Sequence, residues 1–379
     1  MSAEQPTPTE PNAAPRNGAG VNDALQTDGS AGVSVLIPVL DEIDHVDSML
    51  AGLAAQEIDI PVEFLLIDGG SSDGTRERLE EAAREDSRLR VIDNPARQIP
   101  SALNRGLAAS RCRYVARMDA HTVYPGAYLA NGIRRLEAGD AQWVSGPALP
   151  FGEGVWSRRV ALALETSLGV GGATFRRAMT EVETDTGFTG VLHRETLQAL
   201  GGWDEGSLVN EDAELAARLR AAGGRILCIP EMAARYIPRD SLGGLRRQYF
   251  RYGKFRARTS GLHPHGLRRS NLLPPGLVLT LAASLVAPGA LRAVARAGLL
   301  AYVAAVLVTS VRVAARGRPG DALALPAIFA TMHLAWGAGF IAGCLRFGVP
   351  LRAVAHAVSG GRWPRAAASG AAPEPAARS

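Results

Sequence analysis

Short apolar runs alternate with amphipathic stretches between residues 33 and 230, and this alternation restricts the folds that are open to the chain. The runs that we predict as strands are 33–39, 62–68, 89–93, 113–119, 141–146 and 225–230. The stretches that we predict as helices are 43–56, 74–87, 99–110 and 211–224. Because predicted strands and helices alternate along the chain, we expect an α/β domain whose sheet is mostly parallel at its start.

Acidic side chains mark the ends of two of these strands. In open α/β sheets, ligands bind beyond the carboxyl ends of the strands. The first strand ends near Pro38, the second at Asp68 and the fourth at Asp119. We therefore expect both carboxylates to lie at one edge of the sheet. No GxGxxG motif follows the first strand, which argues against a dinucleotide-dependent oxidoreductase.

The last third of the chain contains long uncharged segments. Residues 271–291 and 322–345 carry no charge, and each is long enough for a membrane span of about 20 residues. Residues 297–311 form a shorter uncharged segment. It would span the membrane only if Arg296 and Arg312 extended their side chains to the lipid headgroups. Three such segments in succession favour membrane insertion over buried core helices, and they leave open whether there are two, three or four spans.

A basic amphipathic segment precedes these spans, over residues 240–269. Such a segment is typical of a helix that lies on an anionic membrane surface. Nucleic-acid binding is the competing use of a basic patch, but the sequence contains no recognisable RNA- or DNA-binding module. Because basic segments favour the cytoplasmic side, we expect a multi-pass protein of the cell (inner) membrane whose α/β domain is cytoplasmic.

These observations divide the chain into five parts. They are a disordered tail over 1–31, the α/β domain over 32–239, the basic segment over 240–269, the membrane helices over 270–347 and a C-terminal tail over 348–379. The first tail is rich in Pro, Ala, Gly, Asn and Thr and lacks the apolar core of a signal peptide. The three cysteines show neither metal-binding nor disulfide spacing, so we expect reduced thiols in the cytosol.

Polar motifs lie at the expected strand ends and helix starts. Asp68 is followed by Gly69 and Gly70, and Glu211 and Asp212 open a predicted helix. Taken alone, each motif is explained by an ordinary turn or by acidic residues at a helix N-terminus. Their combination, order and spacing along the chain are more specific.

A resemblance to the family 2 glycosyltransferases of the GT-A fold is carried by four segments in order, VSVLIPVLDE, LLIDGGSSDGT, NPARQIPSALNRGLAAS and ARMDAHTVYP. Three later segments look like the ExoA-like subgroup of succinoglycan glucosyltransferases, namely GFTGVLHRETLQALGGWDE, VNEDAELAARLRAAGG and YIPRDSLGGLRRQYFRYGKFRART. The resemblance implies a Rossmann-like, nucleotide-sugar-binding GT-A domain followed by transmembrane helices. It also implies an enzyme that transfers a sugar from a nucleotide donor, which we expect to be a UDP-sugar.

The resemblance implies donor-binding roles for five residues. Pro38, Glu42 and Asp68 match positions that hold the uridine part of a nucleotide sugar. Asn104 matches a position that lines the same cleft. Asp119 matches the first acid of the family's DxD motif, which approaches the ribose and the metal-bound diphosphate.

His121 stands where the second acid of that motif is usual. An Asp-Ala-His sequence is the familiar form in the ExoA-like subgroup, so the departure does not imply an inactive enzyme. A departing diphosphate needs a divalent cation to offset its charge, and imidazole suits Mn²⁺ better than Mg²⁺. We therefore expect Asp119 and His121 to bind a divalent metal, Mn²⁺ or Mg²⁺, with Mn²⁺ preferred. The alternative is that His121 only donates a hydrogen bond to phosphate.

The resemblance makes Asp212 the expected general base, because it matches the acid of the family's ED motif, with Glu211 beside it. A single base with no second nucleophile fits inversion of the anomeric carbon by direct displacement. Two interpretations of Trp203 stay open, stacking on a sugar and packing in the core. Asp204, next to it, is a candidate for binding a sugar hydroxyl.

Gln248, Arg251 and Tyr252 form a Q-x-x-R-Y pattern, close to the QxxRW motif of processive family members. The resemblance implies that Tyr252 stacks on the acceptor and that Arg251 contacts the diphosphate, while Tyr in place of Trp leaves processivity open. A membrane enzyme of this kind commonly extends a lipid-linked glycan. We therefore expect a lipid-linked or growing glycan acceptor, and no nucleic acid.

Two other functions compete with sugar transfer. A sugar-phosphate nucleotidyltransferase would carry a Gly-rich basic loop after the first strand, and PVLDEIDH is not such a loop. A non-catalytic scaffold that binds a nucleotide sugar would have no use for both Asp119 and Asp212.

Overall fold

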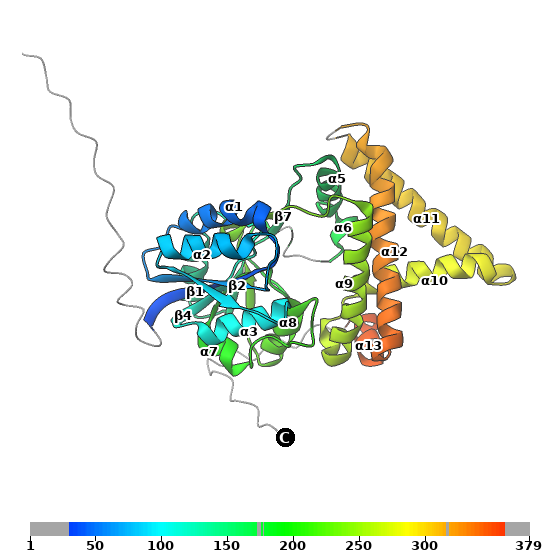
Figure 1. Cartoon of the computed structure of the whole chain (residues 1–379). Helices are drawn as coiled ribbons and strands as arrows, with labels where there is room; N and C mark the ends of the chain where they lie inside the picture. The colour runs from blue at the N-terminus through cyan, green and yellow to red at the C-terminus, as the bar shows by residue number, and fades with distance from the viewer. Residues whose placement is uncertain (1–29, 173–175, 177, 316–317, 361–379) are drawn as a thin grey trace, which may run out of the picture.

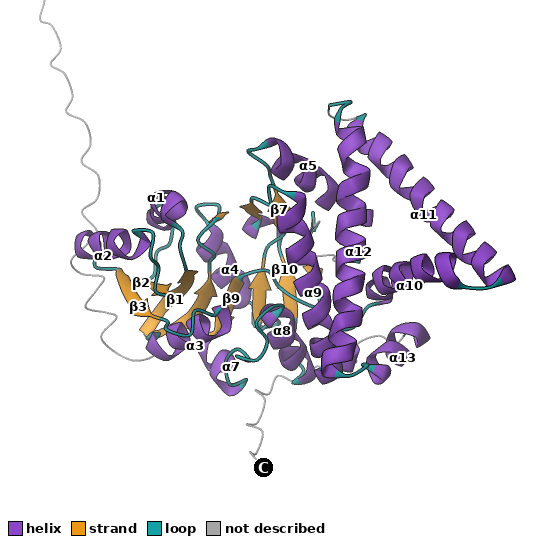
Figure 2. Cartoon of the chain, turned by 45° about the vertical axis from the view of Figure 1, so that its right-hand side comes forward, coloured by secondary structure: helices purple, strands orange, loops and turns teal. Residues whose placement is uncertain are grey.

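The computed structural model describes residues 30–172, 176, 178–315 and 318–360. An eight-stranded sheet lies at the centre of the α/β domain (Figure 2). Its strands in spatial order are β3 (Leu89–Asp93), β2 (Val62–Asp68), β1 (Ser30–Val39), β4 (Cys112–Arg117), β9 (Gly190–His193), β6 (Trp143–Ser145), β10 (Ile226–Cys228) and β8 (Val182–Glu183). The predicted α/β fold is confirmed, and β2 and β3 occupy the predicted ranges.

The first four strands form the parallel half of this sheet. β1 lies between β2 and β4, with Val39 opposite Asp68 and Leu36 opposite Arg117. The carboxyl ends of β2 and β4 therefore flank that of β1 at one edge. Beyond β4 the sheet is mixed, because β9 runs antiparallel to both β4 and β6.

Helices cover both faces of the sheet (Figure 1). One face carries α1 (Ile43–Ala54), α2 (Thr75–Glu85) and α4 (Tyr128–Leu136), and the other carries α3 (Ile99–Ala109), α7 (Arg194–Ala199) and α8 (Glu211–Ala221). Successive strand residues point to opposite faces. In β2, Phe64 and Leu66 therefore join one core, and Leu65 and Ile67 join the other. The domain is thus a three-layer α/β/α sandwich.

A second sheet of three short strands was not predicted. Its strands are β5 (Thr122–Val123), β11 (Ala234–Tyr236) and β7 (Ala148–Pro150). Nearby lie α5 (Val155–Leu164) and α6 (Ser167–Val170), in a region where the sequence had no readable pattern. The three strands and α6 have only two to four residues, too few to show a period in the sequence.

The C-terminal helices form a layer beside the sheet domain (Figures 1 and 2). They are α9 (Leu242–Leu262), α10 (Leu273–Val286), α11 (Gly289–Ala314), α12 (Asp321–Phe347) and α13 (Leu351–Ser359). α9 and α12 approach each other closely through glycines. A side-chain carbon at Gly253 would lie 1.9 Å from the carbonyl oxygen of Trp336, and one at Gly339 would lie 2.1 Å from that of Phe250.

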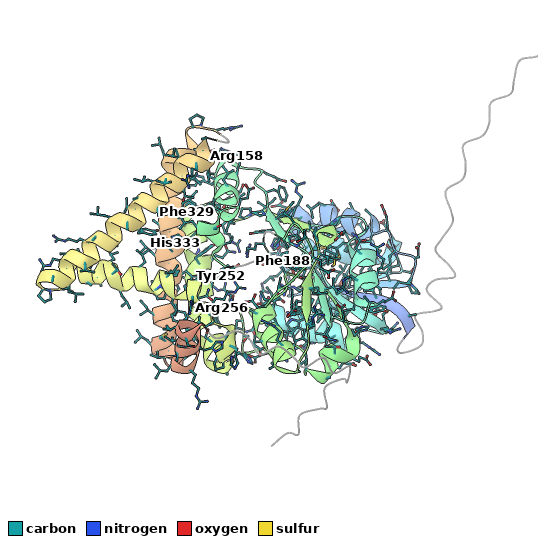
Figure 3. All side chains as sticks on the ribbon, turned by 180° about the vertical axis from the view of Figure 1, so that it is seen from behind. Arg158, Phe188, Tyr252, Arg256, Phe329 and His333 are labelled. Carbon is teal, nitrogen blue, oxygen red and sulfur yellow. The ribbon has the colours of Figure 1, made fainter. Side chains whose placement is uncertain are left out.

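α12 also forms ion pairs and a hydrogen bond with the α/β domain. Arg158 and Arg159 of α5 both donate to the buried carboxylate of Asp321, with shortest N–O distances of 2.7 and 3.0 Å. Further along α12, Nε2 of His333 lies 3.0 Å from the carbonyl oxygen of Leu168. Figure 3 shows Arg158 and His333 at the junction between the two parts of the molecule.

The structure revises the predicted membrane spans. The prediction of one span over 271–291 is wrong, because α10 ends at Val286, before Pro288. The 14 residues of α10 extend about 21 Å, less than the roughly 30 Å of a bilayer core. Residues 297–311, by contrast, lie inside the 26-residue α11. Within the described residues α11 and α12 are long and apolar enough to cross a membrane, which by itself is weak evidence of membrane anchoring.

Candidate active site

Hydrogen bonds join two loops at the carboxyl edge of β1 and β2. Backbone N–H groups of residues 41–43 donate to side chains within residues 71–75, at distances of 2.9 to 3.1 Å. Of the predicted donor-binding residues, Pro38 lies near the end of β1 and Glu42 lies in the first of these loops, and both are half-buried. Their contact with a nucleotide stays a prediction.

Asp68 is buried at the end of β2, with 1% of its surface exposed. Its carboxylate accepts hydrogen bonds from the N–H of Gly70 at 3.1 Å and from the hydroxyl of Ser71 at 2.6 Å. A guanidinium nitrogen of Arg76 lies 3.5 Å away. Asp68 uses these oxygens to shape the loop that follows β2, and its contact with the uridine of a donor stays a prediction.

Arg117, the last residue of β4, joins acids from two separate motifs. Its side chain is 8% exposed. Nε donates to Oδ1 of Asp119 at 2.9 Å, and Nη1 donates to Glu211 at 3.0 Å and to Asp212 at 2.7 Å. Glu211 and Asp212 are the first two residues of α8. Arg117 therefore contacts both Asp119, the predicted donor-side acid, and Asp212, the predicted base.

Three carboxylates around one guanidinium leave an excess of negative charge. Burial raises the pKa of Asp212 to about 7. Arg117 opposes the rise, and the charges of Glu211 and Asp119 add to it. Burial would lower the pKa of Arg117, but the three carboxylates keep it well above its usual value. Arg117 therefore stays charged, while Asp212 has the proton affinity of a general base that works near neutral pH.

His121 pairs with the carboxylate of Glu42. Nδ1 of His121 lies 3.1 Å from Oε1 of Glu42, and the histidine side chain is 52% exposed. The hydrogen bond with Glu42 raises the pKa of His121, against the opposing effect of burial. Metal-binding histidines commonly have a carboxylate on one ring nitrogen, which turns the other toward the metal. Glu42 is therefore placed to orient His121.

The donor atoms fit a divalent cation that is held partly by substrate. Among the described residues, no group of three His, Cys, Asp or Glu side chains is arranged to hold a metal ion. Within the same part of the chain, Arg117 bonds to Oδ1 of Asp119 and no hydrogen bond reaches Oδ2. Mg²⁺ at diphosphate sites usually takes one or two protein ligands, with phosphate oxygens and water completing the shell. Metal binding by Asp119 and His121 at a site of this kind stays a prediction.

Asn104 forms two hydrogen bonds with the backbone of Trp203. Its side-chain amide donates to the carbonyl oxygen of Trp203 at 2.9 Å, and its oxygen accepts from the N–H of Trp203 at 2.8 Å. These bonds anchor the loop before α8, and the position of Asn104 in the donor cleft stays a prediction. Trp203 is 4% exposed and packs in the core, which leaves almost no ring face for a sugar. Asp204 pairs with Arg258 of α9 at 2.8 Å.

Gln248 and Tyr252 lie on α9, where Nε2 of Gln248 is 3.0 Å from the hydroxyl of Tyr252. The carbonyl oxygen of Tyr252 accepts from the side chain of Asn210 at 3.3 Å. Because Asn210 directly precedes α8, the Q-x-x-R-Y motif is attached to the helix that carries Asp212. Arg251 is exposed. Acceptor contacts by these residues stay predictions.

Arg117 and Asn210 are the site residues that sequence analysis missed. Arg117 is a charged residue at the end of a buried strand, and a buried cation requires anionic partners, so a signal was present. Asn210 adopts a φ of 65°, a left-handed conformation that asparagine tolerates. Nothing in the sequence distinguishes it from an ordinary residue before a helix.

A parallel sheet with acids gathered beyond its carboxyl ends is the arrangement of a nucleotide-sugar transferase, and comparison with known proteins agrees. The family model "Glycosyl transferase family 2" matches residues 34–201. Similarity extends further to the succinoglycan biosynthesis protein ExoA of Rhizobium meliloti, with 34% identity over 81% of this chain and 93% of that protein. The chain therefore belongs to glycosyl transferase family 2, and it is an enzyme that transfers a sugar from a nucleotide donor.

Two further relatives are more distant. The poly-beta-1,6-N-acetyl-D-glucosamine synthase of Staphylococcus aureus is 22% identical over 61% of this chain and 56% of that protein. Among solved structures, the mannosyltransferase PcManGT of Pyrobaculum calidifontis, in complex with GDP-Man and Mn²⁺, superposes with a TM-score of 0.58. It is 19% identical and the match covers 86% of this chain and 93% of that one, so it supports the fold.

Proposed function

We propose that this protein is a membrane-attached inverting glycosyltransferase that moves a sugar from a UDP-type donor to a lipid-linked or growing polysaccharide acceptor. The observation that carries the proposal is the shared contact of Arg117 with Asp119 and Asp212, because it sets the donor-side acid beside the base. The similarity to ExoA, whose name refers to succinoglycan biosynthesis, supports a polysaccharide product. Nucleotidyl transfer and a non-catalytic scaffold are set aside because the chain belongs to a transferase family.

In this mechanism Asp212 removes the proton from the acceptor hydroxyl as that oxygen attacks the anomeric carbon. The bond from this carbon to the diphosphate oxygen breaks on the opposite side, so the configuration inverts. Arg117 positions the carboxylate of Asp212 and reduces its repulsion with Asp119. Asp119 and His121 would hold a divalent cation, which would supply positive charge against the leaving diphosphate.

A donor screen tests this function directly. Membrane fractions that contain the protein are incubated with a panel of UDP- and GDP-sugars and with lipid-extract acceptors. Transfer of sugar from one donor into the lipid or polymer fraction is the expected result. Donor binding without any transfer would instead indicate a scaffold.

The metal preference depends on His121. We expect higher kcat/KM with Mn²⁺ than with Mg²⁺, and loss of activity with a chelator, because imidazole binds Mn²⁺ better. Replacing His121 with Asp, which restores a second carboxylate, should lower the Mn²⁺/Mg²⁺ ratio severalfold. The ratio is measured by titrating each metal at fixed donor concentration.

An exposed histidine elsewhere provides the matched control for this variant. His45 lies on α1, and His45→Asp should leave the metal ratio unchanged. If His121→Asp also leaves the ratio unchanged, His121 is not a ligand, and the alternative of a hydrogen bond to phosphate takes its place.

The membrane attachment follows from what the C-terminal helices contact. We infer that α10 and α11 enter the lipid and that α12 lies at the membrane surface. Large apolar side chains of α11 are exposed, with Val294 at 68% and Leu300 at 71%. α12 instead packs against the basic helix α9 and is tied to the α/β domain at Asp321 and His333. A helix that crossed the bilayer would carry these charged neighbours into lipid, at high cost.

Cysteine labelling tests the position of α12. In a variant whose three cysteines are replaced by alanine, single cysteines are introduced at Leu323 and Leu345, near opposite ends of α12 and 88% and 86% exposed. A membrane-impermeant maleimide should label both in inverted vesicles and neither in intact cells. Labelling of the two positions from opposite sides would mean that α12 crosses the membrane.

A further inference from the structure

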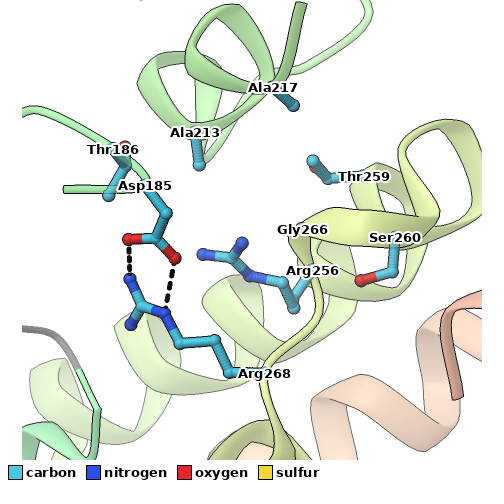
Figure 4. A pocket seen from close by; sticks show the side chains of 9 residues that line it. All are labelled: Asp185, Thr186, Ala213, Ala217, Arg256, Thr259, Ser260, Gly266 and Arg268. Atoms are coloured by element: carbon cyan, nitrogen blue, oxygen red, sulfur yellow. Dashed lines mark hydrogen bonds and ion pairs between the residues drawn. The ribbon is translucent and has the colours of Figure 1, made fainter. Parts of the chain in front are cut away.

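A small closed cavity lies between α8, α9 and the segment that leads into α10 (Figure 4). Its volume is about 20 Å³, enough for one water molecule or one monatomic anion. Two alanines of α8 close one side of it. The lining residues that matter for its chemistry are Asp185, Thr259, Arg256, Ser260 and Arg268.

Positive charge exceeds negative charge around this cavity. Arg268 forms a two-pronged ion pair with Asp185, with Nε 2.6 Å from Oδ2 and Nη2 bonded to Oδ1. This pair occupies both oxygens of the one carboxylate in the described lining. Arg256 extends toward the same place, and no hydrogen bond joins its guanidinium to another described residue. Burial and the neighbouring Arg268 lower the pKa of Arg256 to about 10.

Ser260 gives a second, independent indication of a missing acceptor. The residue is 1% exposed, it lines the cavity, and within the described chain its Oγ has no hydrogen-bond partner. Buried hydroxyl groups are nearly always hydrogen-bonded, so the unpaired hydroxyl of Ser260 is available to donate to a small group in the cavity. Thr259 does not fill this need, because its hydroxyl donates to the carbonyl oxygen of Phe255 at 3.1 Å.

We propose that the cavity binds one small inorganic anion of the size of chloride, held by Arg256 and Ser260. Both groups donate hydrogen bonds, and the local charge is positive. The anion reduces the repulsion between Arg256 and Arg268. Both ligands belong to α9, so the anion stabilises the part of α9 that faces the alanines of α8 and the ion pair of Asp185 with Arg268.

Thermal unfolding of the full-length protein in detergent tests the site. The midpoint is compared in sodium chloride, sodium bromide and sodium gluconate at equal ionic strength, because gluconate is too large for the cavity. We expect midpoints roughly 2–4 °C higher in chloride and bromide than in gluconate. Ser260→Ala and Arg256→Met should each remove most of this difference. The control Arg84→Met, at an exposed arginine of α2, should retain it.

The proposal is overturned if the unfolding midpoint is equal in chloride and gluconate. It is also overturned if both variants show the same salt dependence of the midpoint as the wild type. Either result assigns the cavity to water. Ser260→Ala removes one oxygen atom and carries the test alone if Arg256→Met fails to fold. Crystals grown in bromide give a direct answer, since an anomalous peak beside Arg256 and Ser260 is expected and its absence contradicts the site. None of these measurements uses sugar transfer, so their failure is distinct from a failure of the proposed function.

Discussion

Replacing Asp212 with Asn should reduce sugar transfer by roughly 10²–10⁴-fold while nucleotide binding is retained. The amide preserves the shape of the side chain but cannot take a proton from the acceptor hydroxyl. Arg117 keeps its contacts with Asp119 and Glu211, so the site should stay assembled. Transfer is measured as incorporation of labelled sugar by membrane fractions, and binding as the affinity of the purified variant for the nucleotide.

Glu211→Gln is the matched control, because it removes a neighbouring negative charge at Arg117 without removing the base. It should lose less activity than Asp212→Asn. If Asp212→Asn keeps more than about a tenth of the wild-type rate, another residue is the base. The wild type should also show a pH signature. Since burial raises the pKa of Asp212 to about 7, kcat/KM should fall as the pH drops through that value and Asp212 becomes protonated.

Replacing Arg117 with Met should cause the largest loss of stability at the site. The methionine fills similar space but leaves Asp119, Glu211 and Asp212 close together without a cation. Removing one partner of a buried ion pair typically costs about 3–5 kcal/mol. We therefore expect the thermal midpoint in detergent to fall by roughly 10 °C, together with the loss of transfer activity.

A surface arginine distinguishes this effect from a general loss of charge. Arg78 pairs with Asp47 at 2.8 Å, with 33% and 78% of the two side chains exposed. Surface pairs contribute about 0–1 kcal/mol, so Arg78→Met should lower the midpoint by only a few degrees. Adding Glu211→Gln to Arg117→Met should recover part of the midpoint by removing one repelling charge. An Arg117→Met protein as stable as the wild type would mean that the three acids do not depend on this cation.

Much of the α/β domain could be predicted because its elements are long enough to show a period. β2 and β3 match their predicted ranges, and α1 and α3 begin at the predicted residues. The C-terminal helices were predicted less well, because uncharged runs do not reveal where a helix breaks. Pro288 ends α10 early, and Arg292 and Arg296 lie inside α11 without interrupting it.

The site was predicted only in part, because a motif identifies a residue but not its partners. Asp119 and Asp212 were found from the family resemblance, yet their common partner Arg117 was not. The polar atoms of Asn104 and Asp68, two predicted donor-side residues, also hold neighbouring loops in place, which the motifs do not indicate. These contacts join segments far apart in the sequence, as Asn104 and Trp203 do, and therefore leave no local pattern.

Because α9 meets α12 backbone to backbone at Gly253 and Gly339, a sideways movement of α12 must carry α9 with it. The same α9 holds Asn210, the residue before the helix of Asp212. A displacement of α12 would therefore reach the helix of Asp212, the predicted base, through two short contacts. We expect a detergent that loosens these helices to slow the enzyme while its sheet stays folded.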